Sequence, residues 1–227
     1  MFEHELGVIQ NVFPFLLIGF WQTIKISIVG IVLGSLIGGI LGTLRSFRLP
    51  AVTGAIGFYL HLFRGSPFLI QLYVIYFLLP QTGIAMLEFT SLTAAIVTLS
   101  LYTGSYVTEI VNGAIHAVPR GQVEAGRSLG MTRLETVWHV VLPQAMRLTI
   151  PAMSGVYVII IKNTAILSVI GLTELTRQGE VAIFRFPGDI MLIYVLVAIL
   201  YFVYCYPVLR FTRWAEKRVG GVRVDPL

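Results

Sequence analysis

Long apolar segments constrain the fold of this chain more than any other feature of its sequence. Hydrophobic residues make up 56% of the 227 residues and charged residues only 12%, so the chain is far more apolar than an ordinary globular protein. A helix needs about 20 apolar residues to cross a bilayer core of about 30 Å. The segments of this length predict an all-α integral membrane protein with one domain, residues 1–227, and five spanning helices. Their approximate bounds are 15–44, 54–79, 91–113, 148–170 and 190–209.

The basic residues are distributed unevenly among the loops, and this asymmetry predicts the orientation of the chain. With five spans, the turn after the first span, the loop at 119–143 and the C-terminal tail lie on one side of the membrane. These three segments carry most of the basic residues that flank the spans. The positive-inside rule therefore places the N-terminus outside and the tail in the cytoplasm. The basic residues of the tail are Arg210, Arg213, Lys217, Arg218 and Arg223.

Several function classes are disfavoured by what the sequence lacks. Cys205 is the only cysteine, so no disulfide can form within the chain. A nucleotide-binding loop of the GxxxxGKS type is absent, and so is a paired carboxylate or nucleophile–base set, so the chain is not expected to be an enzyme or to hydrolyse ATP. The net charge of +5 comes from residues beside apolar segments and does not indicate nucleic-acid binding. The histidines are too scattered to indicate a metal site: His4, His61, His116 and His139.

The longest polar insert, residues 119–143, lies between two spans and must have structure of its own. Residues 122–129 are helix-competent, and Gly130 is placed to end that helix. A second short helix, 134–141, is expected to end at Leu142-Pro143. A short helix held outside a membrane domain cannot bury its own apolar side, so it is a candidate plug for a partner protein. A solvated loop with incidental helicity explains these residues equally well.

Two features of the backbone are expected within the spans. Gly30, Gly34, Gly38 and Gly42 recur at every fourth position of the first span. This spacing places them on one side of a helix, where another backbone can approach closely, and makes that side a candidate surface for pairing with a second chain. In the second span, Pro67 removes a backbone hydrogen bond. Such a break is tolerated in a bilayer only where it faces protein or water.

Ionisable residues inside spans are costly in lipid, and Arg64, Glu109 and Lys162 are the three that lie deepest. In a structural interpretation, Arg64 or Lys162 pairs with Glu109 and locks helices together. In a functional interpretation, polar residues line a translocation path in which a zwitterionic solute meets both donors and acceptors. Both interpretations stay open, except that Glu109, nearer the cytoplasmic end of its span, fits the structural one better. The residues of the predicted path are Arg64, Ser66, Gln71, Tyr102, Lys162, Asn163 and Thr164.

Four stretches of the sequence resemble the permease subunits of ATP-binding-cassette (ABC) importers. The EAA signature of these permeases is similar to the stretch that starts at Glu124, EAGRSLGMTRLETVWHVVLP. The branch that takes up polar amino acids is similar to three others: RGSPFLIQLYVIYFLLP, YTGSYVTEIVNGAIHAVPRGQ and IKNTAILSVIGLTEL. The resemblance extends from Gln22 to Trp214, which is nearly the whole chain.

The resemblance implies a type I importer permease whose loop at 119–143 couples the membrane domain to a separate ATPase. Glu124 is expected to meet the ATPase, Ala125 and Gly126 to let the helix enter a narrow cleft. The implied coupling residues are Gln122, Glu124, Ala125, Gly126, Gly130, Leu142 and Pro143.

The assembly that the resemblance implies lies in a bacterial cytoplasmic membrane. It holds a second permease chain, identical or homologous, two ATPase subunits that bind ATP and magnesium, and an external solute-binding protein. The permease chain itself needs no cofactor. The implied solute is a polar amino acid or a similar small zwitterion.

Two departures from the family pattern bear on the solute. Family members usually carry an aspartate where this chain has Asn163, and often an asparagine at Ser154-Gly155. Because asparagine carries no charge, Asn163 argues against a site for arginine or lysine in this subunit. A rival interpretation is a subunit of a secondary transporter or channel driven by ion gradients. It explains the spans and their charges but not a helix–glycine–helix loop that ends in Leu-Pro.

Overall fold

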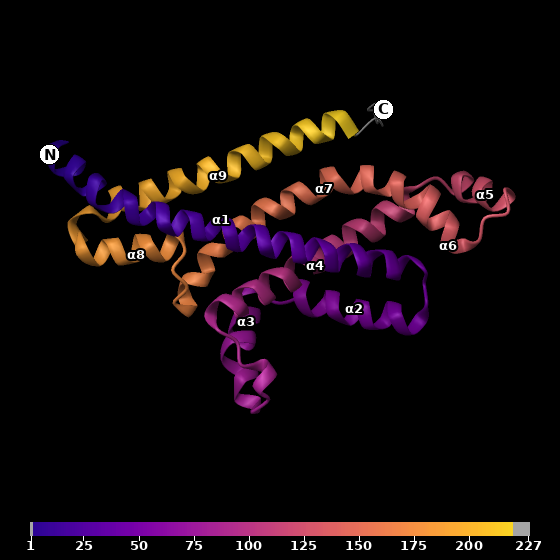
Figure 1. Cartoon of the computed structure of the whole chain (residues 1–227), viewed down its shortest axis with the longest axis horizontal. Helices are drawn as coiled ribbons and strands as arrows, with labels where there is room; N and C mark the ends of the chain where they lie inside the picture. Colours follow the sequence, from indigo (N-terminus) through magenta and orange to yellow (C-terminus); the bar gives the residue numbers. More distant parts are fainter. Residues whose placement is uncertain (1, 220–227) are drawn as a thin grey trace.

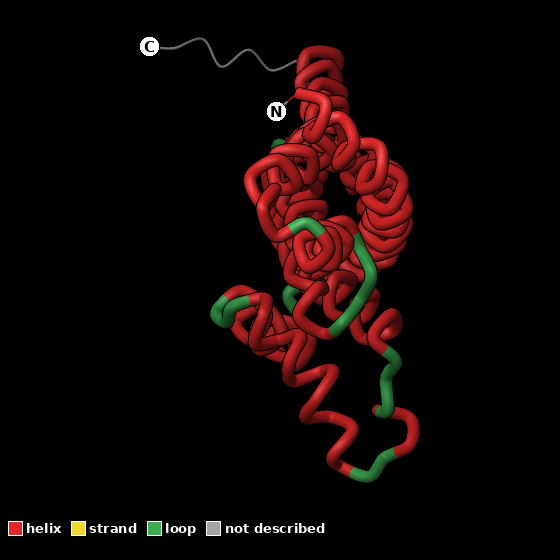
Figure 2. The backbone as a smooth tube through the Cα atoms, turned by 90° about the vertical axis from the view of Figure 1, so that its left-hand side faces the viewer, coloured by secondary structure: helices red, strands yellow, loops and turns green. Residues whose placement is uncertain are grey.

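The chain is helical over almost its whole length, which confirms the all-α prediction. The computed structural model describes residues 2–219, so Arg223 of the predicted basic tail lies outside the described residues. Within that range helices are joined by short loops and no strand forms (Figure 2). The α-helices are α1 (Phe2–Ser46), α2 (Pro50–Arg64), α3 (Phe68–Tyr73), α4 (Ser91–Ala117), α5 (Arg120–Ser128), α6 (Arg133–Thr136), α7 (Leu142–Asn163), α8 (Leu175–Arg185) and α9 (Ile190–Val219).

Four long helices set the length of the molecule. α1, α4, α7 and α9 run roughly along its longest axis, with α5 and α6 at one end and α8 at the other (Figure 1). Counting the bent pair α2–α3 as one span, the described residues contain the five spans that the sequence predicts. The other four are Glu3–Ser46, Ser91–Ala117, Arg133–Ile170 and Pro187–Ala215.

The regularly spaced glycines of α1 pack against α4 of the same chain. A Cβ atom added at Gly30 would lie 2.8 Å from Leu99 Cβ, and one added at Gly42 would lie 2.7 Å from the carbonyl oxygen of Thr108. Only glycine permits so close an approach of two helices. The sequence predicts this close packing correctly. The stripe is filled within the chain, however, so it is not the surface that pairs with a second permease.

The second span is broken where its proline predicts. α2 ends at Arg64, α3 begins at Phe68, and the helix axis turns by 106° between them. Pro67 has an extended backbone (φ −62°, ψ 140°) and cannot donate the hydrogen bond that would continue the helix. The segment that follows α3 projects to one side of the bundle (Figure 1). The bend leaves the end of α2 beside α4, where Arg64 contacts side chains of α4.

The fourth span is longer than predicted because the second helix of the loop runs into it without a break. Helical structure is continuous over 38 residues, from Arg133 to Ile170. The predictions that a separate helix ends at Leu142-Pro143 and that the span begins near residue 148 are therefore wrong. Proline lacks an N–H, and its ring crowds the carbonyl four residues earlier. A π-helical turn just before it, Val137–Val141, accommodates this misfit without ending the helix.

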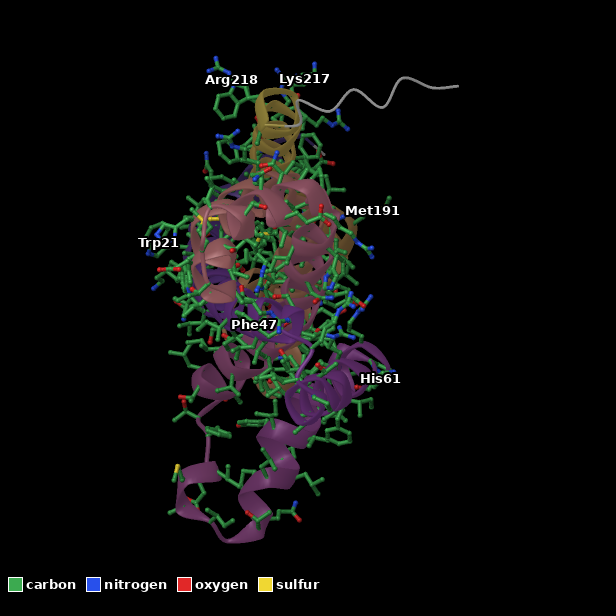
Figure 3. All side chains as sticks on the ribbon, turned by 90° about the vertical axis from the view of Figure 1, so that its right-hand side faces the viewer. Trp21, Phe47, His61, Met191, Lys217 and Arg218 are labelled. Carbon is green, nitrogen blue, oxygen red and sulfur yellow. The ribbon has the colours of Figure 1, made fainter. Side chains whose placement is uncertain are left out.

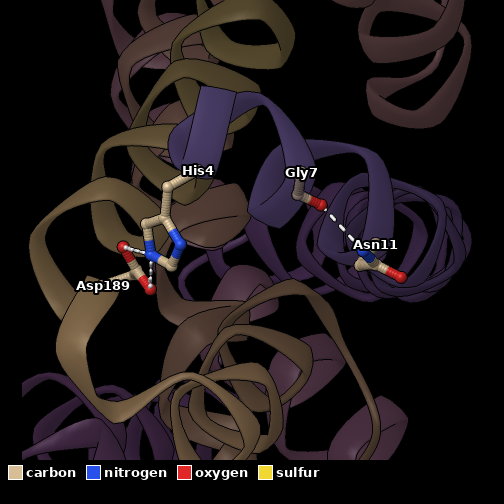
Figure 4. Close-up of polar contacts among 4 residues, drawn as sticks. All are labelled: His4, Gly7, Asn11 and Asp189. Atoms are coloured by element: carbon tan, nitrogen blue, oxygen red, sulfur yellow. Dashed lines mark hydrogen bonds and ion pairs between the residues drawn. The ribbon is translucent and has the colours of Figure 1, made fainter. Parts of the chain in front are cut away.

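The end of the molecule that carries α8 also holds the first turns of α1. His4 Nε2 lies 3.2 Å from the Asp189 carboxylate, which precedes α9, and Asn11 Nδ2 donates to the Gly7 carbonyl at 2.7 Å (Figure 4). The helix begins at Phe2, well before the predicted start of the first span near residue 15, and the His4–Asp189 contact joins its first turn to the segment before α9. The apolar contacts at this end join Val8, Val12, Leu16, Leu175, Ala182, Ile193, Val197 and Leu200.

Large apolar side chains cover the outside of the bundle. Trp21 is 60% exposed and Met191 is 82% exposed, and both point away from the neighbouring helices (Figure 3). An apolar surface of this kind favours aggregation in water, whereas in a bilayer it faces lipid or a partner helix. Lys217 and Arg218 project from the far end of α9 (Figure 3). The exposed apolar side chains on the outside of the bundle therefore agree with the assignment of these helices as membrane spans.

Candidate functional site

The coupling loop, residues 119–143, begins with a short helix whose end is fixed by glycine. α5 covers Arg120–Ser128, close to the predicted 122–129. Gly130 has a φ of +83°, and its N–H donates to the Arg127 carbonyl at 3.0 Å while the N–H of Met131 donates to the Gly126 carbonyl at 3.2 Å. These two bonds form the Schellman motif that commonly ends helices. The predicted role of Gly130 as a helix stop is confirmed.

The turn after Gly130 is fixed by a capping box at the start of α6. The Glu135 N–H donates to Thr132 Oγ1 at 3.3 Å, and the Thr132 N–H donates to Glu135 Oε2 at 2.8 Å. Neither residue was among the sequence-predicted functional residues. The Thr-x-x-Glu pattern just before an apolar run was the signal that identifies such a cap. The coupling loop thus has defined geometry at both sides of its turn.

One side of α5 packs on the membrane domain. Val123 packs with Ala114, Val118 and Val141. Gly126 is buried, and a Cβ added there would meet Thr136 Cγ2 at 3.2 Å. The close contact of α5 with the next helix is a reason for glycine at position 126 within the chain, and the expected entry into a partner's cleft stays a prediction.

The opposite side of α5 is open. Gln122, Glu124 and Ala125 are exposed, and Leu129 is 81% exposed. The Glu124 carboxylate makes no ion pair with the described residues. The exposed side of α5 is available to a partner, as the predicted plug requires. Leu142 and Pro143 lie behind this surface, inside the continuous helix that enters the membrane.

A second group of functional candidates, here named the path cluster, consists of Arg64, Tyr102, Tyr106, Glu109 and Asn163. Arg64 at the end of α2 pairs with Glu109 of α4 and stacks over the Tyr106 ring at 5.3 Å. The Tyr106 and Tyr102 hydroxyls lie 3.2 Å apart, and the Asn163 side chain lies within hydrogen-bonding range of Tyr102. Three separate spans thus contribute to one polar surface.

The charges of the path cluster are only partly covered by this chain. The Arg64 side chain is 40% exposed and that of Glu109 is 45% exposed. The structure forms the Arg64–Glu109 pair that the structural interpretation predicts. A half-exposed ion pair is nevertheless costly against lipid, so this surface must face water or another protein. The pair therefore joins α2 to α4 and still leaves part of both charges exposed.

Ser66 and Gln71 hold the bend in the second span. Gln71 is buried, and its Nε2 donates to the Phe63 carbonyl at 2.8 Å and to the Ser66 carbonyl at 2.9 Å. The Ser66 hydroxyl donates to the Leu62 carbonyl at 2.6 Å. These bonds use the carbonyl groups that lose their helical partners at the bend. In this chain both predicted path residues therefore support the shape of the path.

Lys162 and Thr164 point away from the path cluster. Lys162 is exposed and interacts electrostatically with Cys205 of α9. Thr164 is fully buried, and its hydroxyl donates to the Ile161 carbonyl at 2.6 Å. Of the predicted path residues, the structure brings Arg64, Tyr102 and Asn163 together.

Two residues of interest were missed in the sequence. Tyr106 belongs to the path cluster, and its spacing of four residues from Tyr102 on a helix was a usable signal. Glu174 is fully buried, although in the sequence it is one charge in a mixed polar segment. Burial raises the pKa of Glu174 from the ordinary 4.5 to about 7. The described residues contain no group of three histidines, cysteines or carboxylates placed to hold a metal ion.

The chain is similar to permeases of known transport systems. It is 33% identical over 197 residues to the L-cystine transport system permease protein TcyB of Bacillus subtilis, covering 87% of this chain and 83% of the relative. It is 35% identical over 178 residues to the glutamine transport system permease protein GlnP of Escherichia coli, covering 78% and 81%.

Solved transporters share the fold. A chain from the crystal structure of an amino acid ABC transporter with histidines superimposes with a TM-score of 0.83 at 30% identity, over 94% of this chain and 97% of that chain. A chain of the MetNI methionine ABC transporter has the same fold, with a TM-score of 0.70 at 24% identity over 90% and 98%. The family described as binding-protein-dependent transport system inner membrane component matches residues 30–221. This chain therefore belongs to that family of inner membrane components of binding-protein-dependent transport systems.

Proposed function

We propose that this chain is the permease subunit of an ATP-driven importer for a polar amino acid or a similar small zwitterion. It forms part of the translocation path and couples that path to separate ATPase subunits. The relatives that are permeases for cystine and glutamine support the solute class. The chain lies in a bacterial cytoplasmic membrane, with its N-terminus outside and α5 in the cytoplasm, as the distribution of basic residues supports.

The observation that carries this proposal is the construction of the coupling loop. α5 leaves Glu124 exposed, ends at the turn formed by Gly130, and is followed by a helix that runs unbroken from Arg133 to Ile170. At about 1.5 Å per residue, this helix is roughly 57 Å long. A displacement of α5 is thereby carried through the membrane and past Asn163 by a single rigid element.

Two ATPase subunits supply the movement in this mechanism. They bind ATP and magnesium, and their closure moves the two coupling loops of a permease pair together. The linked helices then tilt and switch the path between inward and outward access. An external solute-binding protein delivers the solute. A second permease chain, identical or homologous, covers the half-exposed Arg64–Glu109 surface, because five spans are too few to enclose a path.

The chemistry of the path cluster supports a zwitterionic solute without a cationic side chain. Arg64 supplies a positive charge for a carboxylate, and Glu109 balances it. The tyrosine hydroxyls and the Asn163 amide both donate and accept hydrogen bonds. Because Asn163 is uncharged, an Asn163→Asp variant is expected to gain uptake of cationic amino acids.

Glu124→Gln tests the proposed docking surface. Purification of the tagged chain with its ATPase should recover at least tenfold less ATPase from this variant, while its thermal stability stays the same because the side chain is exposed. Glu180→Gln on α8 is the matched control and should recover ATPase at the wild-type level.

The substrate is tested with the reconstituted wild-type complex and a panel of amino acids. Stimulation of ATP hydrolysis by a polar amino acid and its binding protein is expected. Uptake that persists without any ATPase and follows an ion gradient would instead establish the secondary transporter.

A further inference from the structure

Glu174 is a carboxylate buried without a cation. Its residue exposure is 0%, and no ion pair joins it to any described residue. The nearest arginine in sequence, Arg177, pairs instead with Glu180 at 3.0 Å. Burial of a carboxylate is costly unless hydrogen bonds satisfy it. A simple polar loop does not explain why Glu174 is buried at this position.

Hydrogen bonds from two helices satisfy the Glu174 carboxylate. Its two oxygens accept the backbone N–H groups of Thr176 at 2.9 Å and Arg177 at 2.8 Å, which caps the start of α8. The Tyr201 hydroxyl of α9 donates to Glu174 Oε2 at 3.1 Å. The carboxylate thus ties the beginning of α8 to the middle of α9.

The Tyr201 hydroxyl also reaches the end of the fourth span. It lies 3.2 Å from Thr176 Oγ1 and 3.5 Å from Thr164 Oγ1. Thr164 directly follows Asn163 of the path cluster and is fully buried. Glu174, Thr176, Tyr201 and Thr164 therefore form one polar contact set, here named the α8 joint, which connects three elements; Glu174 and Thr164 are fully buried, and Thr176 and Tyr201 are partly exposed.

α8 itself is held closely between α1 and α9. A Cβ added at Gly19 of α1 would lie 2.9 Å from Leu175 Cα, and one added at Gly179 of α8 would lie 2.8 Å from Val197 Cγ2. The Leu175 N–H donates to Thr23 Oγ1 of α1 at 3.1 Å. α8 cannot shift without α1 and α9. The fourth span packs on α9 through Val158, Ile161 and Cys205, and the α8 joint adds a polar contact between the end of that span and α8.

We propose that Glu174 and Tyr201 are positioning residues that pass the movement of the fourth span to α8 and back. The inference rests on the proposed function, in which the helix Arg133–Ile170 is displaced by the ATPase. That helix ends at Ile170, four residues before Glu174. The Glu174 carboxylate accepts three hydrogen bonds that fix it relative to α8 and α9, and the Tyr201 hydroxyl packs against Thr164 at 3.5 Å, so the α8 joint passes on a displacement that a flexible turn would absorb. Conversely, a solute-binding protein that contacts the α8 end shifts the fourth span and, through it, α5.

Tyr201→Phe is the sharpest test, because it removes one hydroxyl and keeps the ring. The assay measures ATP hydrolysis of the complete reconstituted transporter, first alone and then with solute-loaded binding protein. Stimulation by the binding protein should fall about tenfold, while the basal rate and the amount of assembled complex stay within twofold of the wild type. Tyr204→Phe is the matched control: its hydroxyl lies 2.8 Å from Ser27 Oγ, one turn along α9 and outside the α8 joint. Its stimulation should stay at the wild-type level.

Variants of Glu174 test the other side of the contact with Tyr201. Glu174→Ala should lose stimulation about tenfold, and Glu174→Gln, which keeps an oxygen acceptor, should recover most of it. Adding Tyr201→Phe to Glu174→Ala should cause no further loss, because both remove the same link. Thr164→Val against Thr98→Val provides a second pair if Tyr201→Phe does not assemble. Both threonines are buried and donate to a backbone carbonyl, but only Thr164 contacts Tyr201, so only Thr164→Val should lower stimulation.

The outcomes distinguish this inference from the proposed function. If the wild-type complex shows no stimulation by any loaded binding protein, the proposed function fails, and the inference fails with it. If the wild type is stimulated and Tyr201→Phe equals Tyr204→Phe, or Thr164→Val equals Thr98→Val, only the α8 joint is refuted. Equal losses of basal and stimulated rates in Tyr201→Phe would also refute it, since they indicate a general packing defect.

Discussion

Short helices lie at the two ends of the fourth span, and the glutamate of each lies in an opposite environment, one exposed and one buried. At one end, α5 exposes Glu124 and leaves it without an ion pair among the described residues. At the other, the residue that caps α8, Glu174, is fully buried and accepts three hydrogen bonds. An exposed carboxylate on a rigid helix is available to a partner. A buried one that is satisfied internally serves the chain itself, so the comparison separates an interface from an internal joint.

The largest effect is expected from a substitution in the backbone turn at the α5 end, which tests whether the shape of this end matters. Gly130→Val places a β-branched residue at a φ of +83°, which costs at least roughly 1–2 kcal/mol locally. The Schellman motif should open and α5 should lose its fixed direction. Transport and ATPase recovery are expected to fall at least tenfold, while the chain still inserts in the membrane. Uptake by cells and purification with the ATPase are the measurements.

Gly121→Ala is the control for this substitution. Gly121 lies in the same helix, has no positive φ, and a Cβ added there meets no atom within 4 Å. It should behave as the wild type or slightly better, because alanine favours helix. Normal transport by Gly130→Val would show that the shape of the coupling loop is unimportant.

The buried glutamate at the α8 end gives a smaller effect that depends on pH. Burial raises the pKa of Glu174 from 4.5 to about 7. Between these values the folded protein holds a proton that the unfolded chain has lost, so stability falls as pH rises from about 4.5 to about 7. The contribution is on the order of 3 kcal/mol. Glu174→Gln removes it, so the melting temperature of the purified complex should fall with pH less in the variant than in the wild type.

Glu180→Gln is the reference for this measurement, because Glu180 lies on the same helix and is partly exposed. It should keep the wild-type pH dependence. Parallel melting curves for the wild type and Glu174→Gln at every pH would mean that Glu174 does not titrate in this range. The two ends would then not differ in the way the burial of Glu174 implies.

Features that depend on the local sequence were predictable, whereas features that depend on residues distant in the chain were not. The spans, the break at Pro67 and the stop at Gly130 follow from apolar length and from the backbone restrictions of proline and glycine. The helix through Pro143 was predicted to end because a sequence does not show a π-helical turn. The residues of α4 that contact the glycine stripe lie far along the chain, as Leu99 does from Gly30. From the sequence alone, Glu174 is expected to be solvated. Its burial depends on Tyr201 of α9, which contacts it, and on Thr23 of α1, which binds the start of α8.

The path cluster was predicted in part for the same reason. Polar residues inside apolar spans mark Arg64, Tyr102 and Asn163 as candidates. The direction in which each side chain points depends on the bend of the second span and on the helix ends. Thr164 follows Asn163 directly, yet it faces α9 and not the path. Adjacent residues of a helix point about 100° apart, so a run of polar residues cannot all line one surface.

The Arg64–Glu109 pair is intermediate in exposure between Glu124 and Glu174. Its substitution is expected to have the smallest effect of the three. Both side chains are about half exposed in the single chain, and pairs of that kind contribute roughly 0–1 kcal/mol. A double-mutant cycle with Arg64→Gln and Glu109→Gln in the isolated chain in detergent should therefore give a coupling energy below about 1 kcal/mol. In the proposed assembly a second permease covers the pair, which lowers the local dielectric, so the coupling energy should rise severalfold. An equal value in both forms would mean that this surface faces water throughout the transport cycle, because only burial by a partner strengthens the pair.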